Sequence, residues 1–303
     1  MRVAISGSTG LIGTHLSRAL VAGGHDVVSI VRRPAGPGEI TWDPSSGSIE
    51  ADSLIGIDAV VNLSGAGIGD RRWTTSYKRT LLESRTQTTQ VLSNAIATVV
   101  SSGGPRRLLS GSAIGFYGAR GDETLTEHST AGDGFLSEIC VDWERSTASA
   151  SEAGVSVAHL RTGIVLTPAG GALRKLLPLF RLGVGGRMGS GRQYQSWISI
   201  DDEVNAIIHL LTSDREGPVN LTAPHPVTNA EFTNVLARVV HRPALFPVPG
   251  FGPKLLLGSE LAEALLLTGQ RVIPDVLLND GFEFAHSDLG AALTHVLGSS
   301  QRQ

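Results

Sequence analysis

Short runs of apolar and β-branched residues alternate with longer stretches of helical periodicity through the first two thirds of the chain. The runs are RVAIS at 2–6, DVVSIVR at 26–32, DAVVNLS at 58–64, RRLLSGS at 106–112 and VSVAHLR at 155–161. Each has the length of a strand buried on both faces, and the segments between them can form crossover helices. The pattern predicts an α/β fold with a doubly wound parallel sheet.

The pattern changes after residue 161. Glycine-rich loops and short helices fill 167–198, and the helical run DDEVNAIIHLLTS at 201–213 is expected to return to the sheet. Helical patterns predominate from 222 onward. We therefore predict a sheet domain over 1–221 with an excursion at 167–198, followed by a smaller, mainly α-helical C-terminal substrate lobe over 222–303.

Composition narrows the class of protein. Lys and Arg total 25 against 28 Asp and Glu, a formal net charge of -3, which argues against a broad nucleic-acid surface. Cys140 is the single cysteine, so neither an intramolecular disulfide nor a multi-cysteine metal cluster is expected. The histidines are not paired at ligand spacing, and we predict no metal site.

Apolar patterning also bears on location. The chain enters a strand pattern at once, which argues against an export signal, and the apolar run at 254–267 is interrupted by Glu260 and Glu263. We expect a cytoplasmic protein that binds a small-molecule substrate and has neither a membrane nor a nucleic-acid partner. The pattern predicts no particular oligomeric state.

A glycine-rich segment, GSTGLIG, follows the first strand directly and opens a helix. Its glycines allow a tight turn and close passage of a pyrophosphate, while the N–H groups and dipole of the helix N-terminus attract phosphate. This context favours a dinucleotide site over a plain βα turn. The predicted contacts are Gly7, Ser8, Thr9, Gly10, Leu11, Ile12 and Gly13.

The end of the second strand indicates which dinucleotide is bound. NAD-preferring sites usually place an acidic residue there for the ribose hydroxyls, whereas this chain has Arg32 and Arg33. Guanidinium groups match a 2′-phosphate in charge and geometry, so we predict NADP. A solvated surface pair is the alternative.

Several further segments resemble a known family. They are NLSG at 62–65, SGSAIGFYG at 110–118, SRTQTT at 84–89, FLSEICVDWE at 135–144, LRTGIVL at 160–166, GSGRQYQSWISIDD at 189–202 and GQRVIPDVLLNDGFEF at 269–284. Together they are similar to the extended short-chain dehydrogenase/reductases, and within them to an atypical epimerase-like family with a C-terminal module of unknown function. The resemblance covers almost the whole chain.

The resemblance implies an NADP-binding sheet domain and a small lobe that closes over a substrate, with nucleotide sugars as the usual substrates of the broader superfamily. It places further cofactor contacts on Leu63, Ser64 and Gly65. Arg85, in SRTQTT, is another cofactor candidate by the same matching.

A proton donor is missing where the superfamily keeps one. Its enzymes carry a Tyr, with a Lys four residues later on the same helix face, and counting back from Glu144 puts this pair at Leu136 and Cys140. Leucine has no proton to donate. A cysteine among apolar neighbours is more often a small core residue than a catalyst.

Two nearby hydroxyl groups are the remaining catalytic candidates. Ser112 matches the serine that steadies a substrate hydroxyl in the superfamily, and Tyr117 lies in the same segment. A phenol titrates near 10, so acid–base work at neutral pH needs a shift of about three pKa units. A Tyr packed beside the nicotinamide or substrate without titrating is the milder alternative.

Cationic residues and glycine-rich loops mark the substrate lobe. No Asp or Glu occurs between Val155 and Ile200, which suits recognition of a phosphate or carboxylate. Packing of these cations against the acidic stretch at 122–144 is the structural alternative. The predicted substrate contacts are Arg187, Arg192, Gln193 and Trp197, although Trp197 also fits a core position.

These features predict an NADP-dependent oxidoreductase or epimerase that acts on a small anionic or sugar-like molecule. The alternative is a non-catalytic protein that senses or sequesters NADP(H), having lost the Tyr and Lys.

Overall fold

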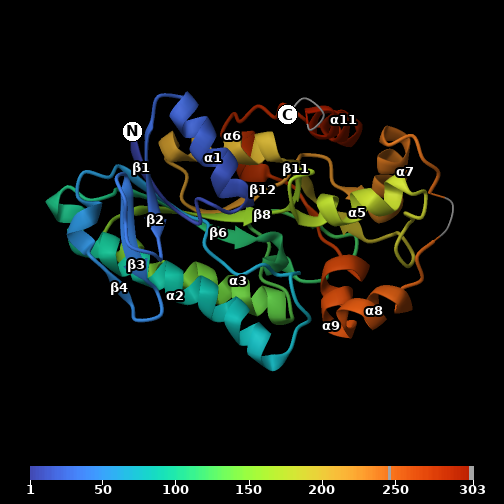
Figure 1. The fold of residues 1–303 in the computed structure, drawn as a ribbon, viewed down its shortest axis with the longest axis horizontal. Helices are drawn as coiled ribbons and strands as arrows, with labels where there is room; N and C mark the ends of the chain where they lie inside the picture. The colour runs from blue at the N-terminus through green and yellow to red at the C-terminus, as the bar shows by residue number, and fades with distance from the viewer. Residues whose placement is uncertain (245–246, 300–303) are drawn as a thin grey trace.

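An eight-stranded sheet forms the centre of the computed structural model, which describes residues 1–244 and 247–299 (Figure 1). All neighbouring strands are parallel except β3 and β4. In spatial order the strands are β12 (Gly217–Leu221), β8 (Ser156–Thr162), β6 (Arg107–Ala113), β5 (Ala59–Asn62), β1 (Arg2–Ser6), β2 (Asp26–Val31), β3 (Glu39–Asp43) and β4 (Ser48–Ile49). The predicted doubly wound fold is confirmed.

The chain order of the strands creates a switch point beside β1. From β1 the chain moves through β2 to β3 on one side, and returns through β5, β6, β8 and β12 on the other. In open sheets of this kind, ligands bind across the carboxyl ends of the strands at the point where the direction reverses. The glycine-rich segment at 7–13 lies at this point.

Helices cover both faces of the sheet (Figure 1). One face carries α1 (Leu11–Ala22) and α6 (Ile200–Thr212), which contact each other. The other carries α2 (Thr75–Val99), α3 (Phe135–Arg145) and α4 (Ala148–Glu152). Because both faces are covered, nearly all residues of the central strands β1, β5 and β6 are buried.

The C-terminal lobe is mainly helical, and most of it lies at one end of the sheet (Figure 1). Its helices are α5 (Gly171–Arg181), α7 (Asn229–Val239), α8 (Phe251–Leu257), α9 (Ser259–Ala262), α10 (Asp275–Asn279) and α11 (Leu289–Ser299). Two short strand pairs join it to the sheet domain: β7 (Thr124–Leu125) with β14 (Arg271–Val272), and β9 (Ile164–Leu166) with β11 (Trp197–Ser199). A third pair, β10 (Tyr194–Gln195) with β13 (Val227–Thr228), lies within the lobe. The lobe therefore joins the sheet domain at several points.

One apolar core runs through both parts of the chain. Val3 on β1, Ile207 on α6, Phe232 on α7 and Leu293 on α11 belong to the same cluster of buried side chains. A second cluster fills the space between the sheet and α2. The residues assigned to the C-terminal lobe thus complete the core on the α6 face.

Polar side chains fix where several helices begin. Thr228 and Glu231 form a capping box at α7, and Ser199 accepts the backbone N–H of Asp202 at α6.

No helix among the described residues has both the length and the apolar character needed to cross a bilayer.

Candidate cofactor and substrate site

The glycine-rich segment forms a tight turn between β1 and α1 because its glycines lie where side chains do not fit. Gly7 has φ +74°, and a Cβ there would lie 2.8 Å from the carbonyl of Leu63. A Cβ on Gly13 would lie 2.2 Å from the Gly7 oxygen. The segment can therefore hold a pyrophosphate close to its backbone.

The first turn of α1 is free to bind an anion. Gly10 caps the helix with extended backbone and supplies no side-chain hydrogen bond, and the first turn contains no acidic residue. Its backbone N–H groups and positive dipole end therefore have no competing side chain of the helix itself. Leu11 and Ile12 belong to this first turn, and Ser8 and Thr9 belong to the loop that leads into it. The arrangement fits the pyrophosphate of a dinucleotide.

The two arginines at the end of β2 differ in whether their side chains pair with another residue. Arg33 is exposed and forms a bidentate ion pair with Glu39, with Nη1–Oε2 and Nη2–Oε1 distances of 2.6 and 2.5 Å. The Arg33 hydrogen bond holds the pKa of Glu39 below its usual range. Arg32 is exposed, and no hydrogen bond or ion pair joins its side chain to another described residue. Arg32 is thus the better candidate for a 2′-phosphate contact.

Buried hydrogen bonds fix the ends of β1 and β5 beside the phosphate turn. Ser6 donates to Asn62 Oδ1 at 2.5 Å, and Asn62 Nδ2 donates to Thr89 Oγ1 at 2.8 Å. The indole N–H of Trp143 donates to the same threonine at 2.9 Å. This network joins the two strands to α2 and α3, so the turn rests on a rigid base.

Arg85 holds the loop that follows β5. Its guanidinium donates to the carbonyls of Leu81 and Ala66, both at 3.0 Å, and lies over the Trp143 ring at 5.1 Å from its centroid. Burial lowers the pKa of Arg85. Arg85 therefore holds in place the loop that carries the predicted contacts Leu63, Ser64 and Gly65.

The helix position of the missing proton donor is apolar in the structure as well. Leu136 and Cys140 face Gly115, where an added Cβ would lie 3.2 and 3.9 Å from their side chains. Burial raises the pKa of the Cys140 thiol to about 11, and the thiol donates to the Ala113 carbonyl at 3.6 Å. This thiol stays protonated at neutral pH and is not poised for acid–base chemistry.

Ser112 belongs to a buried ionic network instead of facing a substrate. Its hydroxyl donates to Glu144 Oε1 at 2.7 Å, and only 5% of the residue is exposed. Arg161 pairs with both oxygens of Glu144 at 2.8 Å. In this structure the only proton of the Ser112 hydroxyl is donated to a carboxylate. The contact of Ser112 with a substrate hydroxyl stays a prediction.

Tyr117 is a core residue, which corrects the prediction that it lines the site. The side chain is fully buried, and its hydroxyl donates to Asn220 Oδ1 at 2.6 Å and accepts from Arg161 Nη1 at 3.1 Å. Burial raises the pKa of the phenol above its usual value. Both the catalytic role and the milder packing role at the cofactor fail, because no part of the side chain reaches the surface.

The predicted substrate residues separate into surface and core. Arg187 and Arg192 are exposed, and Arg187 donates to the Ser190 carbonyl at 2.7 Å. Gln193 spans the lobe by donating to the carbonyls of Met188 and Leu266. Trp197 is fully buried and donates to the His225 carbonyl at 3.1 Å. The expectation that Trp197 lines the cleft is therefore wrong, and its core alternative holds.

The start of α5 lies beside the phosphate turn, a position that the sequence alone does not show. A Cβ on Gly170 would lie 2.8 Å from the side chain of Leu11, so the loop before α5 packs against the phosphate turn. Lys175 donates to the Gly69 carbonyl at 2.8 Å across the β5 loop. The glycine pair GGALRK at 170–175 was the available signal. These contacts place the exposed cations Arg174 and Lys175 near the pyrophosphate region.

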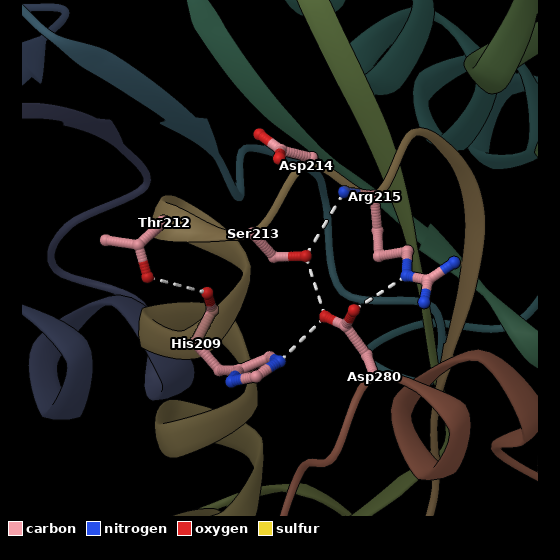
Figure 2. Close-up of a pocket in the computed structure, with 6 residues that line it drawn as sticks. All are labelled: His209, Thr212, Ser213, Asp214, Arg215 and Asp280. Atoms are coloured by element: carbon pink, nitrogen blue, oxygen red, sulfur yellow. Dashed lines mark hydrogen bonds and ion pairs between the residues drawn. The ribbon is translucent and has the colours of Figure 1, made fainter.

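A separate hollow lies at the opposite edge of the sheet, where α6 leads into β12 (Figure 2). Asp280, which follows α10, accepts hydrogen bonds there from His209 at 2.8 Å, Ser213 at 2.7 Å and Arg215 at 2.7 Å. Burial alone would raise the pKa of Asp280, but these hydrogen bonds outweigh it and lower the pKa to about 2. The hollow is thus built around a satisfied carboxylate that ties the lobe to the sheet domain.

The described residues hold no cluster of three or more His, Cys, Asp or Glu side chains suited to a metal ion. The site consists of a backbone cradle, a free arginine and a cationic lobe. Together with the fold, it defines a protein of the nucleotide-binding Rossmann class.

Comparison with known proteins identifies the family. The model described as the NAD dependent epimerase/dehydratase family matches residues 3–222, and the model described as a domain of unknown function (DUF1731) matches 248–296. The chain belongs to the NAD-dependent epimerase/dehydratase family. The resemblance seen in the sequence is thereby confirmed.

Full-length relatives share both parts of the chain. The Epimerase family protein Mb2239 of Mycobacterium bovis is 48% identical over 96% of each chain. A crystal structure of the human epimerase family protein SDR39U1 with NADPH superposes with a TM-score of 0.89 at 36% identity, covering 98% of this chain and 99% of that one.

A further solved structure, of a nucleoside-diphosphate sugar epimerase from Corynebacterium glutamicum, has a TM-score of 0.81 at 40% identity. The match covers 99% of this chain and 58% of that one.

Proposed function

We propose that the chain binds NADP(H) and uses it for hydride exchange with a small anionic substrate, as an oxidoreductase or epimerase. The observation that carries the proposal is the pairing of an unobstructed phosphate turn with Arg32 at the end of β2. Arg32 carries an unpaired charge among the described residues, whereas Arg33 is engaged by Glu39. A 2′-phosphate is the group that this arrangement distinguishes.

The relatives support the same cofactor and a sugar nucleotide as the substrate class. The human relative was solved with NADPH, and the Corynebacterium glutamicum protein is described as a nucleoside-diphosphate sugar epimerase. In this chain Arg174, Lys175, Arg187 and Arg192 give the lobe exposed positive charge. Such charge suits a diphosphate or carboxylate on the substrate.

The residues have distinct parts in this function. The turn at 7–13 and the N-terminus of α1 bind the pyrophosphate, and Arg32 binds the 2′-phosphate. Arg85 orients the loop at 63–65 that forms the wall beyond it. When bound, the nicotinamide group accepts or supplies the hydride, and the lobe cations orient the substrate and help exclude water.

A non-catalytic NADP(H)-binding protein is the second candidate function. It is favoured by Leu136 and Cys140 at the place of the proton donor, and by the burial of Ser112 and Tyr117. Both functions need the same cofactor site, so only a measurement of catalytic turnover can distinguish them.

Titration calorimetry on the cofactor-free protein tests the cofactor assignment. Arg32→Ala is expected to weaken NADPH binding on the order of 10- to 100-fold, because a charge-assisted contact is lost, and to leave NADH binding unchanged. Arg33→Ala is the matched control and should have a smaller effect, since Glu39 already engages that guanidinium. Tighter binding of NADH than of NADPH by the wild-type protein would refute the proposal.

Turnover then separates the two candidates. The reduced-nicotinamide absorbance is followed with ketones and aldehydes. With nucleotide sugars the product sugars are analysed as well, because an epimerase returns its hydride and consumes no net NADPH. Consumption of NADPH or conversion of any sugar excludes the non-catalytic protein, whereas tight binding with neither change favours it.

A further inference from the structure

A buried carboxyl group lies at the carboxyl edge of the sheet, and the cofactor cradle does not use it. Glu203, in the first turn of α6, is fully buried. Its Oε1 accepts a hydrogen bond from the hydroxyl of Thr162 at 2.9 Å, and its Oε2 has no hydrogen-bond partner among the described residues. A buried carboxyl oxygen without a partner is costly, which sets this group apart from an ordinary core residue.

Thr162 connects the buried carboxyl to the site. It is the last residue of β8, stands in register with Ala113 at the end of β6, and is partly exposed. Arg32 and the phosphate turn hold the adenosine half of a dinucleotide at β2 and β1. The nicotinamide half must therefore extend the other way, over the ends of β5, β6 and β8, where β8 lies about 14 Å from β1.

We propose that Thr162 and Glu203 form the proton-transfer pair of this site and replace the absent tyrosine and lysine. Thr162 is the residue that meets the substrate oxygen, and Glu203 is a positioning residue that supplies its proton. The proposal rests on the hydride-exchange function proposed above.

The step balances in protons and charge. Reduction of a carbonyl to an alcohol consumes a hydride from the reduced cofactor and one proton. In its protonated form Glu203 can donate to Thr162 Oγ1 instead of accepting from it, which frees the Thr162 hydroxyl proton. That proton passes to the substrate oxygen, the Glu203 carboxyl proton passes to Thr162, and Glu203 is left as a carboxylate that solvent later reprotonates. In the oxidising direction each transfer is reversed.

Glu203 has the protonation state that this step needs. Burial raises its pKa to about 8, although the hydrogen bond with Thr162 opposes the shift, so the carboxyl is mostly neutral at pH 7. A neutral carboxyl can donate its proton, whereas an ionised one cannot.

Charged groups on the elements around Glu203 are engaged elsewhere. Asp202 accepts the backbone N–H groups of Ala285 and His286, and Asp201 pairs with His295. On α1, His15 bonds the Leu11 carbonyl and Arg18 lines a surface hollow with Asp201. On the sheet, Arg161 is paired with Glu144 and Arg107 bonds the Leu210 carbonyl at the far end of α6. The charge on the bound nicotinamide is therefore the change that Glu203 would sense.

Proton release on cofactor binding tests the pair without a known substrate. The oxidised nicotinamide ring is positively charged and the reduced ring is neutral, so only NADP⁺ should displace the Glu203 proton. Calorimetry is run at about pH 7.5 in buffers of different ionisation enthalpy. The number of protons released on binding should be larger for NADP⁺ than for NADPH by roughly half a proton at least. The 2′-phosphate is common to both cofactors and cancels in the difference.

Matched variants assign the proton. Glu203→Gln should remove the difference and retain NADPH affinity within about twofold, whereas Thr162→Val should retain the difference and lower any turnover at least tenfold. Glu127→Gln is the control, because Glu127 is also buried with an unpartnered Oε2 and a pKa raised by burial, but contacts Asn220 and Val276 instead. It should leave the difference intact.

The outcomes distinguish the two proposals. Absence of binding heat with either NADP form removes the proposed function and this pair with it. Binding without a proton difference, or a difference that persists in Glu203→Gln, overturns the pair alone. If that variant does not fold, difference infrared spectroscopy of the wild-type protein decides the matter: the protonated carboxyl band must be lost on adding NADP⁺ and kept on adding NADPH.

Discussion

Arg161 is a buried side chain that holds Glu144, the carboxylate that also accepts the Ser112 hydroxyl. It is only 3% exposed, pairs with both oxygens of Glu144, and lies with its guanidinium 3.4 Å from the centroid of the Phe116 ring. For Arg161, this pairing agrees with the structural alternative given for the cations between Val155 and Ile200, in which they pack against the acidic stretch at 122–144. The exposed cations at 174–192, in contrast, form no ion pair with that stretch among the described residues.

Arg161→Met should lower the free energy of unfolding by about 3–5 kcal/mol, because Glu144 would remain buried without its cation. Urea denaturation measures the loss, and the double variant with Glu144→Gln should recover part of it. Arg145→Ala is the control: its pair with Asp142 is exposed, so its loss should cost under about 1 kcal/mol. Equal losses for Arg161→Met and Arg145→Ala would contradict the buried pair.

At the scale of elements, the junction of β1 and α1 depends on close backbone contact. A methyl group at Gly13 cannot fit, because it would lie 2.2 Å from the Gly7 oxygen and 2.8 Å from the Ser8 Cα. The helix would have to move away from the strand that carries the phosphate turn.

Gly13→Ala is expected to weaken NADPH binding at least tenfold and to lower stability by about 1–3 kcal/mol through overpacking. Calorimetry and thermal unfolding measure the two effects. Gly252→Ala, in α8, is the control because an added Cβ meets nothing within 4 Å. Normal cofactor affinity in Gly13→Ala would show that the contact is not required.

The same scale shows what the sequence could and could not predict. Strands such as RVAIS and DAVVNLS were evident because both of their faces are buried, which makes the whole run apolar. The strand EITWD, which lies next to the edge strand β4, is not evident because polar residues alternate along it. Tyr117 and Trp197 were assigned to the site because aromatic residues suit both clefts and cores, and burial depends on packing that one sequence does not display. Glu203 sits in the run DDEV, where an acidic residue reads as helix capping.

At the scale of the whole molecule, Asp280 joins the C-terminal lobe to the end of α6. Its pKa of about 2 is below the usual value of 3.8, so its ionised form stabilises the fold. This stability is fully present above about pH 4 and is lost as the pH falls toward 2.

Asp280→Asn should lower the free energy of unfolding by about 2 kcal/mol at pH 7, since the charge that accepts three hydrogen bonds is removed. Urea denaturation between about pH 7 and pH 2 tests the sign, because the difference from wild type should shrink at the acidic end. A difference that is constant with pH would contradict the assigned carboxylate. Asp288→Asn, at a residue that caps the start of α11, is a control that should show a smaller loss.

The continuous apolar core has a consequence for how the protein can be dissected. A fragment that stopped at residue 221 would uncover buried side chains of β9 and β11, because α11, which packs on both strands, would be gone. Such a fragment would fail as a folding unit before its cofactor chemistry could be assayed. Residues 222–303 supply part of the same apolar core as the sheet domain. Their contribution to substrate recognition therefore has to be measured with point substitutions and not with deletions.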